Sequence, residues 1–191
     1  MPTHVALLRG INVGGRNKVA MADLREVVSS LGHTGVTTYI QSGNVVFTAA
    51  GAAEPAALAA GLERAIAAAL GVSPRVVVVS RDELAQVVRD NPYPDEPNPK
   101  AVHAVFLTGD PGPETADAIA AAQQAAAAKG SRDTAQLVGR TLYLHTPDGF
   151  GRSELAAQLS RAGRPGDTGT GRNWATVTKL LAMCDDPSPS G

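Results

Sequence analysis

The chain has 191 residues, of which 43% are hydrophobic and 18% are charged, and its formal net charge is −1. Its apolar runs are far shorter than the roughly 20 residues of a membrane-spanning helix, so the composition predicts a water-soluble globular protein with no membrane span. The start, MPTHVALLRG, lacks the basic and apolar regions of a secretion signal. One cysteine, Cys184, excludes an intramolecular disulfide. We therefore expect a cytoplasmic protein.

Residues 1–90 show strand and helix signals in the order βαββαβ, followed by a linking helix. Apolar runs and helical spacing predict the elements, and a capping box of Ser80 and Glu83 predicts the start of the linking helix. A glycine-rich loop, GINVGGRNK, follows the first strand. In chain order we expect a strand at 5–8, a helix at 21–31, a hairpin within 37–49, a helix at 58–70 ended by Gly71, a strand at 75–79 and a helix around 84–88.

The same order begins again after a proline-rich junction at 91–99, whose four prolines exclude a helix or a central strand. Residues 100–185 then show a strand, an Ala-rich helix at 113–129, a hairpin turning near 139–140, a helix around 155–162, a short extended piece and a final helix. We predict an α+β fold of two tandem split-βαβ, ferredoxin-like units, each an antiparallel sheet with helices on one face. Residues 186–191 are polar and predicted to be a disordered tail.

Basic residues concentrate near the two ends of the chain. Residues 1–20 carry a charge of +3, residues 161–180 carry +3, and the remainder carries −7. This distribution predicts an anion site if the fold brings the two stretches together. Scattered, solvated bases are the alternative.

The glycine-rich loop is the sharpest candidate for a binding site. Its glycines, asparagines and bases follow a strand directly and would present backbone N–H groups and cations to a phosphate or carboxylate. The alternative is that the glycines only turn a strand into a helix. Residues 10–17 nearly match a P-loop, but Arg16 and Asn17 stand where lysine and Ser/Thr are needed, which argues against nucleotide hydrolysis.

Two further segments carry candidate residues. The first hairpin turn offers Gln41, Ser42 and Asn44, although turn chemistry alone explains an asparagine there. The segment GRNWATVTKL offers Arg172 and Asn173 before a helix. The histidines lack metal-ligand spacing and no hydrolase motif is present, so we predict no metal and no cofactor and assign no catalytic residue.

Four segments, ALLRGINVGGRNKV, YIQSGNVVF, YLHTPDGFGRSEL and GRNWATVTKL, resemble those of the bacterial family catalogued as domain of unknown function 1697. The resemblance spans residues 6–180 and implies no mechanism, since the activity of the family is not established. Departures are Arg16 in place of lysine and Gly171 in place of a larger residue. By this resemblance the candidate anion-binding residues are Arg9, Asn12, Gly14, Gly15, Lys18, Gln41, Ser42, Asn44, Arg172, Asn173 and Lys179.

Three functions remain open from the sequence. The first is binding of an anionic or phosphorylated small molecule where the basic loop meets Arg172. In this hypothesis Arg9, Asn12, Lys18, Arg172 and Asn173 converge on one pocket, with Ser42 and Asn44 at its edge. The second is a nucleic-acid-binding module, against which stand the near-neutral charge and the scarcity of aromatic residues on the predicted strands. The third is a protein-interaction or oligomeric scaffold.

Overall fold

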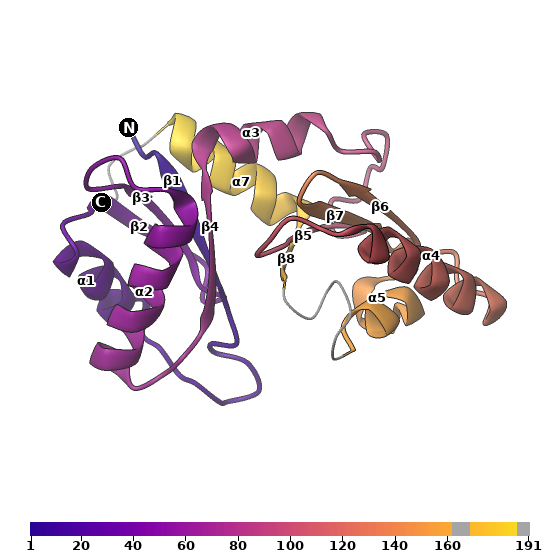
Figure 1. Cartoon of the computed structure of the whole chain (residues 1–191), viewed down its shortest axis with the longest axis horizontal. Coiled ribbons are helices and arrows are strands. Elements are labelled where there is room, and N and C mark those ends of the chain that lie inside the picture. The colour runs from indigo at the N-terminus through magenta and orange to yellow at the C-terminus, as the bar shows by residue number, and fades with distance from the viewer. Residues whose placement is uncertain (162–168, 187–191) are drawn as a thin grey trace. The chain divides into compact units, whose positions relative to one another are not determined.

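The computed structural model describes residues 1–161 and 169–186, which divide into two compact units (Figure 1). The first unit comprises Met1–Gln86 together with the chain from Lys179 onward, and the second comprises Val87–Thr178. The division falls within a helix, α3 (Arg81–Arg89), which precedes the proline-rich segment. Of the tail expected at 186–191, residues 187–191 lie outside the described residues, as does Ala162 of the predicted helix around 155–162.

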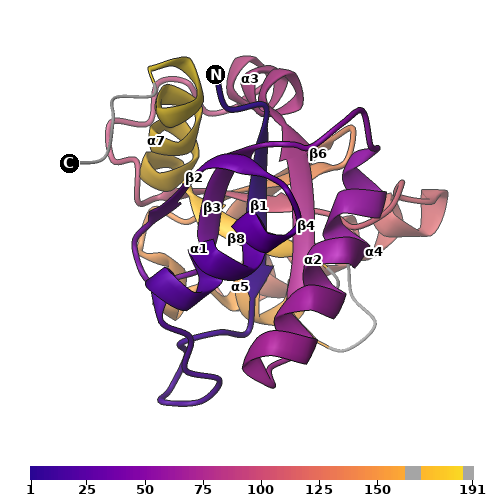
Figure 2. The ribbon, with the colours of Figure 1, turned by 90° about the vertical axis from the view of Figure 1, so that its left-hand side faces the viewer.

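The described residues of the first unit form a four-stranded antiparallel sheet in the strand order β2-β3-β1-β4. Helices α1 and α2 lie across one face of this sheet (Figure 2). Gly71 adopts a left-handed conformation with a φ of 67° and ends α2, as predicted. The elements are β1 (His4–Arg9), α1 (Met21–Ser30), β2 (Thr34–Tyr39), β3 (Asn44–Thr48), α2 (Pro55–Leu70) and β4 (Arg75–Ser80).

The core of the first unit lies between the sheet and its two helices. Side chains alternate across a strand, so Ala6 and Leu8 of β1 face the helices. They pack in one cluster with Leu24 of α1, Phe47 of β3 and Leu62 of α2, all of which are buried. Removing such side chains from water is the main contribution that holds a unit of this size together.

The described residues of the second unit form another four-stranded antiparallel sheet, in the order β6-β7-β5-β8. Helices α4 and α5 pack against one face of it (Figure 1). Its elements are β5 (Val102–Phe106), α4 (Pro113–Ala128), β6 (Thr134–Val138), β7 (Thr141–His145), a 3-10 turn (Phe150–Arg152), α5 (Glu154–Leu159) and β8 (Thr170–Asn173), followed by α7 (Trp174–Asp185).

The two units repeat one topology, which confirms the predicted tandem α+β architecture. When β5, β6, β7 and β8 are matched to β1, β2, β3 and β4, the two strand orders become identical. Even a local bond recurs: Leu8 N–H donates to Gly43 O at 2.8 Å, and Leu107 N–H donates to Arg140 O at 3.0 Å, at the same place in each repeat.

The repeats differ at one end of the sheet. In the first unit the connection from β1 to α1 spans residues 10–20 and the β2–β3 turn spans 40–43, whereas the matching connections in the second unit span only 107–112 and 139–140. Because the second unit makes the same fold with shorter connections, the extra residues of the first unit are not needed for the topology. Loops that exceed what a scaffold requires are where binding sites commonly lie.

The capping box at the start of α3 is present as predicted. Ser80 Oγ accepts the backbone N–H of Glu83 at 3.1 Å, and Glu83 Oε2 accepts the backbone N–H of Ser80 at 2.7 Å. Two backbone donors at the end of β4 and the start of α3 are thus satisfied reciprocally.

We expect Ser80→Ala to lower the free energy of unfolding by about 1 kcal/mol, since an N-cap acceptor is lost. Glu83→Gln should retain most of the stability, because glutamine also completes a capping box. Ser29→Ala, at an exposed position in α1, is the matched control and should be neutral or slightly stabilising. Urea denaturation measures all three; equal effects of the two serine substitutions would contradict this role of Ser80.

Candidate functional site

The connection between β1 and α1, residues 10–20, is a small β-hairpin that we call the finger. Asn12 N–H donates to Asn17 O and Arg16 N–H donates to Val13 O, both at 3.0 Å. Gly14 and Gly15 between them have φ angles of 57° and 75°, which defines a type I′ turn and requires residues that tolerate positive φ. The finger projects beyond the end of the sheet (Figures 1 and 2).

The side chain of Asn12 holds the base of the finger closed. Its Nδ2 donates to Val19 O and to Gln41 O, each at 3.0 Å, and its Oδ1 accepts the N–H of Val19 at 2.8 Å. One amide therefore joins the start of the finger, its end and the β2–β3 turn. Both amide hydrogens of Asn12 are used for the backbone, so this side chain positions the neighbouring residues.

The β2–β3 turn packs directly on the finger. Gly43 has a φ of 80°, and a Cβ there would lie 2.7 Å from Leu8 Cβ and 2.9 Å from Ile11 Cδ1. Asn44 is fully buried and donates from Nδ2 to Tyr39 O and to Ser42 Oγ. Asn44 thus closes the turn, and only glycine allows the turn to approach Ile11 so closely.

An open pocket of about 330 Å³ lies where the finger, the start of α1 and the β2–β3 turn meet. The exposed Lys18 brings a cation to it, and Ala20, the N-cap of α1, makes no side-chain capping bond. The first backbone N–H groups of a helix carry partial positive charge, so both features favour an anion. The pocket is lined by Asn12, Gly15, Lys18, Val19, Ala20 and Gln41.

Four of the predicted site residues therefore lie around one pocket: Asn12, Gly15, Lys18 and Gln41. Gly14 neighbours them in the turn of the finger, Arg9 ends β1, and Ser42 is exposed in the β2–β3 turn. These residues all belong to the first unit.

The C-terminal candidates occupy different surroundings. Asn173 Oδ1 accepts the N–H of Thr176 at 2.9 Å and so caps α7, while Arg172 Nη1 donates to Gly171 O at 2.8 Å. Burial lowers the pKa of the Arg172 guanidinium to about 10, which leaves it charged at neutral pH. Arg172 and Asn173 belong to the second unit, and Lys179 is exposed on α7 in the first. That Arg172 and Asn173 converge with the finger on one pocket stays a prediction.

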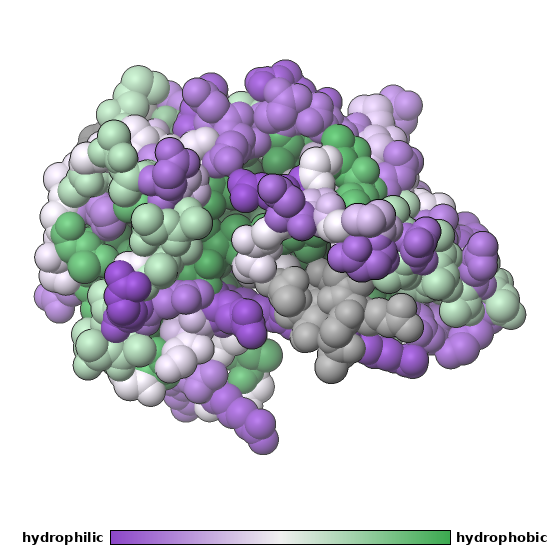
Figure 3. All heavy atoms as spheres, viewed as in Figure 1, coloured by the Kyte–Doolittle hydropathy of each residue, from purple (hydrophilic) through white to green (hydrophobic). Residues whose placement is uncertain are grey.

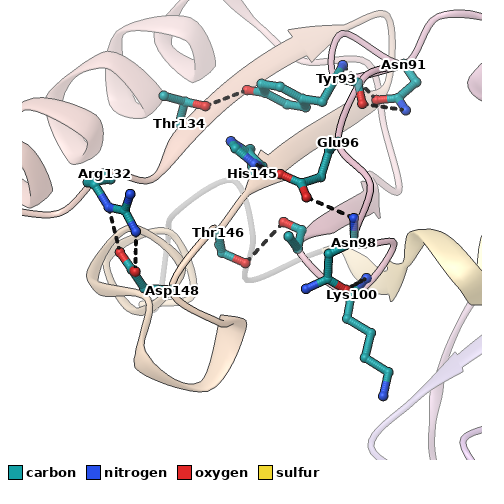
Figure 4. Close-up of polar contacts among 11 residues, drawn as sticks. Asn91, Tyr93, Glu96, Asn98, Lys100, Arg132, Thr134, His145, Thr146 and Asp148 are labelled. Carbon is teal, nitrogen blue, oxygen red and sulfur yellow. Dashed lines mark hydrogen bonds and ion pairs between the residues drawn. The ribbon is translucent and has the colours of Figure 1, made fainter.

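A polar cluster that the sequence reasoning missed anchors the proline-rich segment, residues 91–100, in the second unit (Figure 4). His145 Nε2 lies 2.6 Å from Glu96 Oε2, and the ring of Tyr93 stacks on His145 with a centroid distance of 5.0 Å. Thr134 Oγ1 donates to the Tyr93 hydroxyl at 3.0 Å. Two hydrogen bonds hold the pKa of the Glu96 carboxyl below its usual value: the larger effect comes from the Asn98 N–H and the smaller from His145.

The sequence contains a signal that residues 91–100 form an ordered segment. Asn-Pro-x occurs twice, and in both cases the asparagine side chain accepts the N–H two residues on: Asn91 from Tyr93 at 3.0 Å, and Asn98 from Lys100 at 3.1 Å. Such Asx turns indicate an ordered segment. The sequence pattern predicts only a junction at 91–99 and assigns no role to His145. Because Glu96 and His145 hold the segment in place, we assign them a structural role.

Metal and thiol chemistry find little support within the described part of the chain. There, no three His, Cys, Asp or Glu side chains gather in a group that would hold a metal ion. Cys184 is 1% exposed and burial raises the pKa of its thiol to about 11, so the reactive thiolate is scarce at neutral pH. None of the described helices combines the length and the apolar character needed to cross a membrane.

Comparison with known proteins places the chain in a family. The model of the family described as protein of unknown function (DUF1697) matches residues 1–143, and the chain belongs to this family. The solved structure of the conserved bacterial protein SP0830 from Streptococcus pneumoniae is similar, with a TM-score of 0.71 and 23% sequence identity over 96% of this chain and 98% of that one. This similarity supports the fold. The curated proteins gave no match.

We expect Gly43→Ala to cost about 2–4 kcal/mol of stability, since it adds both positive-φ strain and overpacking against Leu8 and Ile11. Gly14→Ala, where a Cβ meets nothing within 4 Å, should cost about 1 kcal/mol from strain alone. Chemical denaturation of the two variants measures the difference. Equal losses would show that the turn is not packed on the finger as described.

Proposed function

We propose that the first unit binds a small ligand through an anionic group, a phosphate or a carboxylate, in the pocket at the base of the finger. The observation that carries this proposal is the pocket itself, which is lined by Lys18 and by the uncapped start of α1. The pocket is built from the two connections that exceed what the repeated fold needs. A cation beside the start of a helix favours an anion there, because the first backbone N–H groups of a helix carry partial positive charge.

The surrounding charge supports the same ligand. Residues 1–20 contain Arg9, Arg16 and Lys18 and no acidic residue, which raises the local potential and attracts anions from solution. Asp23, in the first turn of α1, offsets part of this potential. A small anionic metabolite also suits the cytoplasmic location expected from the sequence.

The two other functions have less support. Nucleic-acid binding at this site would call for aromatic side chains that stack on bases, and the residues that line the pocket include none. A role as a protein-interaction scaffold would rest on exposed apolar side chains such as Val138 and Phe150, which by themselves are ordinary on a protein surface. We therefore propose anion binding as the function, and we assign no reaction to the protein.

We expect inorganic phosphate to raise the melting temperature of the wild-type protein, because a ligand at a hundredfold its dissociation constant adds about 2.7 kcal/mol of stability. Lys18→Met should fold normally, since Lys18 is exposed, and should lose most of this shift. Lys100→Met, at an exposed position outside the pocket, is the matched control and should keep it. A phosphate response that is absent in the wild type or unchanged in Lys18→Met would refute the proposal.

Arg172→Ala tests whether the C-terminal segment shares this site. If Arg172 contacts the same anion, as the charge pattern of the sequence predicts, its variant should lose the phosphate response as Lys18→Met does. If Arg172→Ala keeps the full response, the pocket in the first unit is sufficient and the predicted convergence is wrong. The unfolding midpoint without phosphate reports whether the variant is folded.

A further inference from the structure

We infer that the ligand of the finger pocket is an amphipathic anion, in which one anionic group meets Lys18 and an aliphatic portion contacts the exposed side chains of Ile40 and Val13. This inference rests on the proposed function and names the class of ligand.

Ile40 is the first observation. It lies in the β2–β3 turn beside Gln41, its side chain is 52% exposed, and its φ is 50°. A β-branched residue in the left-handed region is strained, and glycine or asparagine would occupy this position at lower cost. Because the side chain of Ile40 is exposed, its packing adds little stability to the core that would offset the strain. Strain without a gain in packing indicates a side chain that serves contact with another molecule.

Val13 is the second observation. It is 67% exposed and is the first residue of the type I′ turn of the finger. The bond from Asn12 Nδ2 to Gln41 O joins the finger to the β2–β3 turn. Val13 directly follows Asn12 in the chain, and Ile40 directly precedes Gln41. Both exposed aliphatic residues are thus adjacent in the chain to residues that line the pocket. The projecting end of this unit combines hydrophilic and hydrophobic residues (Figure 3).

The pocket lining points to the same class of ligand. Among the described residues that line it, Lys18 alone is charged, and Val19, Ala20 and Gly15 add no polar side chain. Both Nδ2 hydrogens of Asn12 are already bonded to backbone carbonyls. One charged side chain among the residues that line the pocket matches a ligand with one anionic group. The volume of about 330 Å³ is at the small end for ligand pockets, which favours a small soluble molecule.

The test is a series of inorganic phosphate and ethyl, butyl and hexyl phosphate, with dissociation constants measured by calorimetry. We expect affinity to rise along the series by up to roughly fourfold per methylene, which corresponds to about 0.8 kcal/mol per buried CH₂. Phosphate binding that is independent of chain length would overturn this inference and leave the proposed function standing. Failure of every member to bind would overturn both.

Two variants test the contact residues. Ile40→Asn should leave the dissociation constant of inorganic phosphate unchanged and flatten the rise from ethyl to hexyl phosphate. It should also keep or raise the melting temperature, because asparagine tolerates positive φ; a residue needed for folding would lower it. Val13→Ser should flatten the same rise. Leu31→Asn, an exposed leucine at the end of α1 with a φ of −81°, is the control and should preserve the rise. An unchanged rise in both pocket variants would overturn the inference.

A phospholipid also combines an anionic group with an aliphatic portion. A separate experiment therefore distinguishes a membrane from a soluble ligand. The protein is sedimented with vesicles of phosphatidylglycerol and phosphatidylcholine, and with vesicles of phosphatidylcholine alone. We expect it to stay in solution in both cases. Sedimentation with the anionic vesicles that is lost in Ile40→Asn would overturn the inference of a soluble ligand.

Discussion

The site depends on the side chain of Asn12. One amide makes three hydrogen bonds, two to Val19 and one to Gln41 O, and so fixes the two ends of the finger and the neighbouring turn at once. A loop of this length would otherwise have many conformations, and ordering each residue costs about 1–2 kcal/mol. The bonds of Asn12, with the close approach of Gly43 to Ile11, help to offset that cost. Lys18 and Ala20 are thereby held at the rim of a defined pocket.

The duplicated fold shows why this end of the first unit stands out. Both units form the same sheet, and the second makes the connection after its first strand in six residues and its hairpin turn in two, at 107–112 and 139–140. The common fold therefore sets the minimum that these connections require. The first unit exceeds that minimum at both places, and it carries positive φ at Asn12, Asn17 and Ile40. Long connections and the strained Ile40 occur at the same end of the sheet, which supports the proposed binding site.

Much of the fold could be predicted because its signals are local. Helical spacing, the Ser80–Glu83 capping box and Gly71 as a helix end each depend on a few neighbouring residues, and all are present in the structure. The duplication followed from the order of the elements, although the two halves share little residue identity. Side-chain roles were harder to predict, because the sequence shows a residue type and not its partner. Asn12 and Asn173 were candidates for ligand contacts, and both hold backbone groups.

The contacts between distant segments were beyond local reasoning. The pair of Glu96 and His145 joins residues 49 positions apart, and neither residue lies in a spacing that indicates the other. The strain at Ile40 was also hidden, since its place next to Gln41 in a hairpin is compatible with ordinary strand geometry. Sequence reasoning singled out the glycine-rich loop and the first hairpin turn, and the three-dimensional arrangement was needed to show that residues of both line one pocket.

The most direct test of the account is a ¹H–¹⁵N NMR titration of the wild-type protein with inorganic phosphate, which reports on each backbone amide in turn. We expect the largest chemical-shift changes at Gly15, at residues 18–23 and at Gln41, and little change at residues 107–112 and 139–140, the matching connections of the second unit. Changes confined to residues outside the finger, the start of α1 and the β2–β3 turn would contradict binding in the finger pocket.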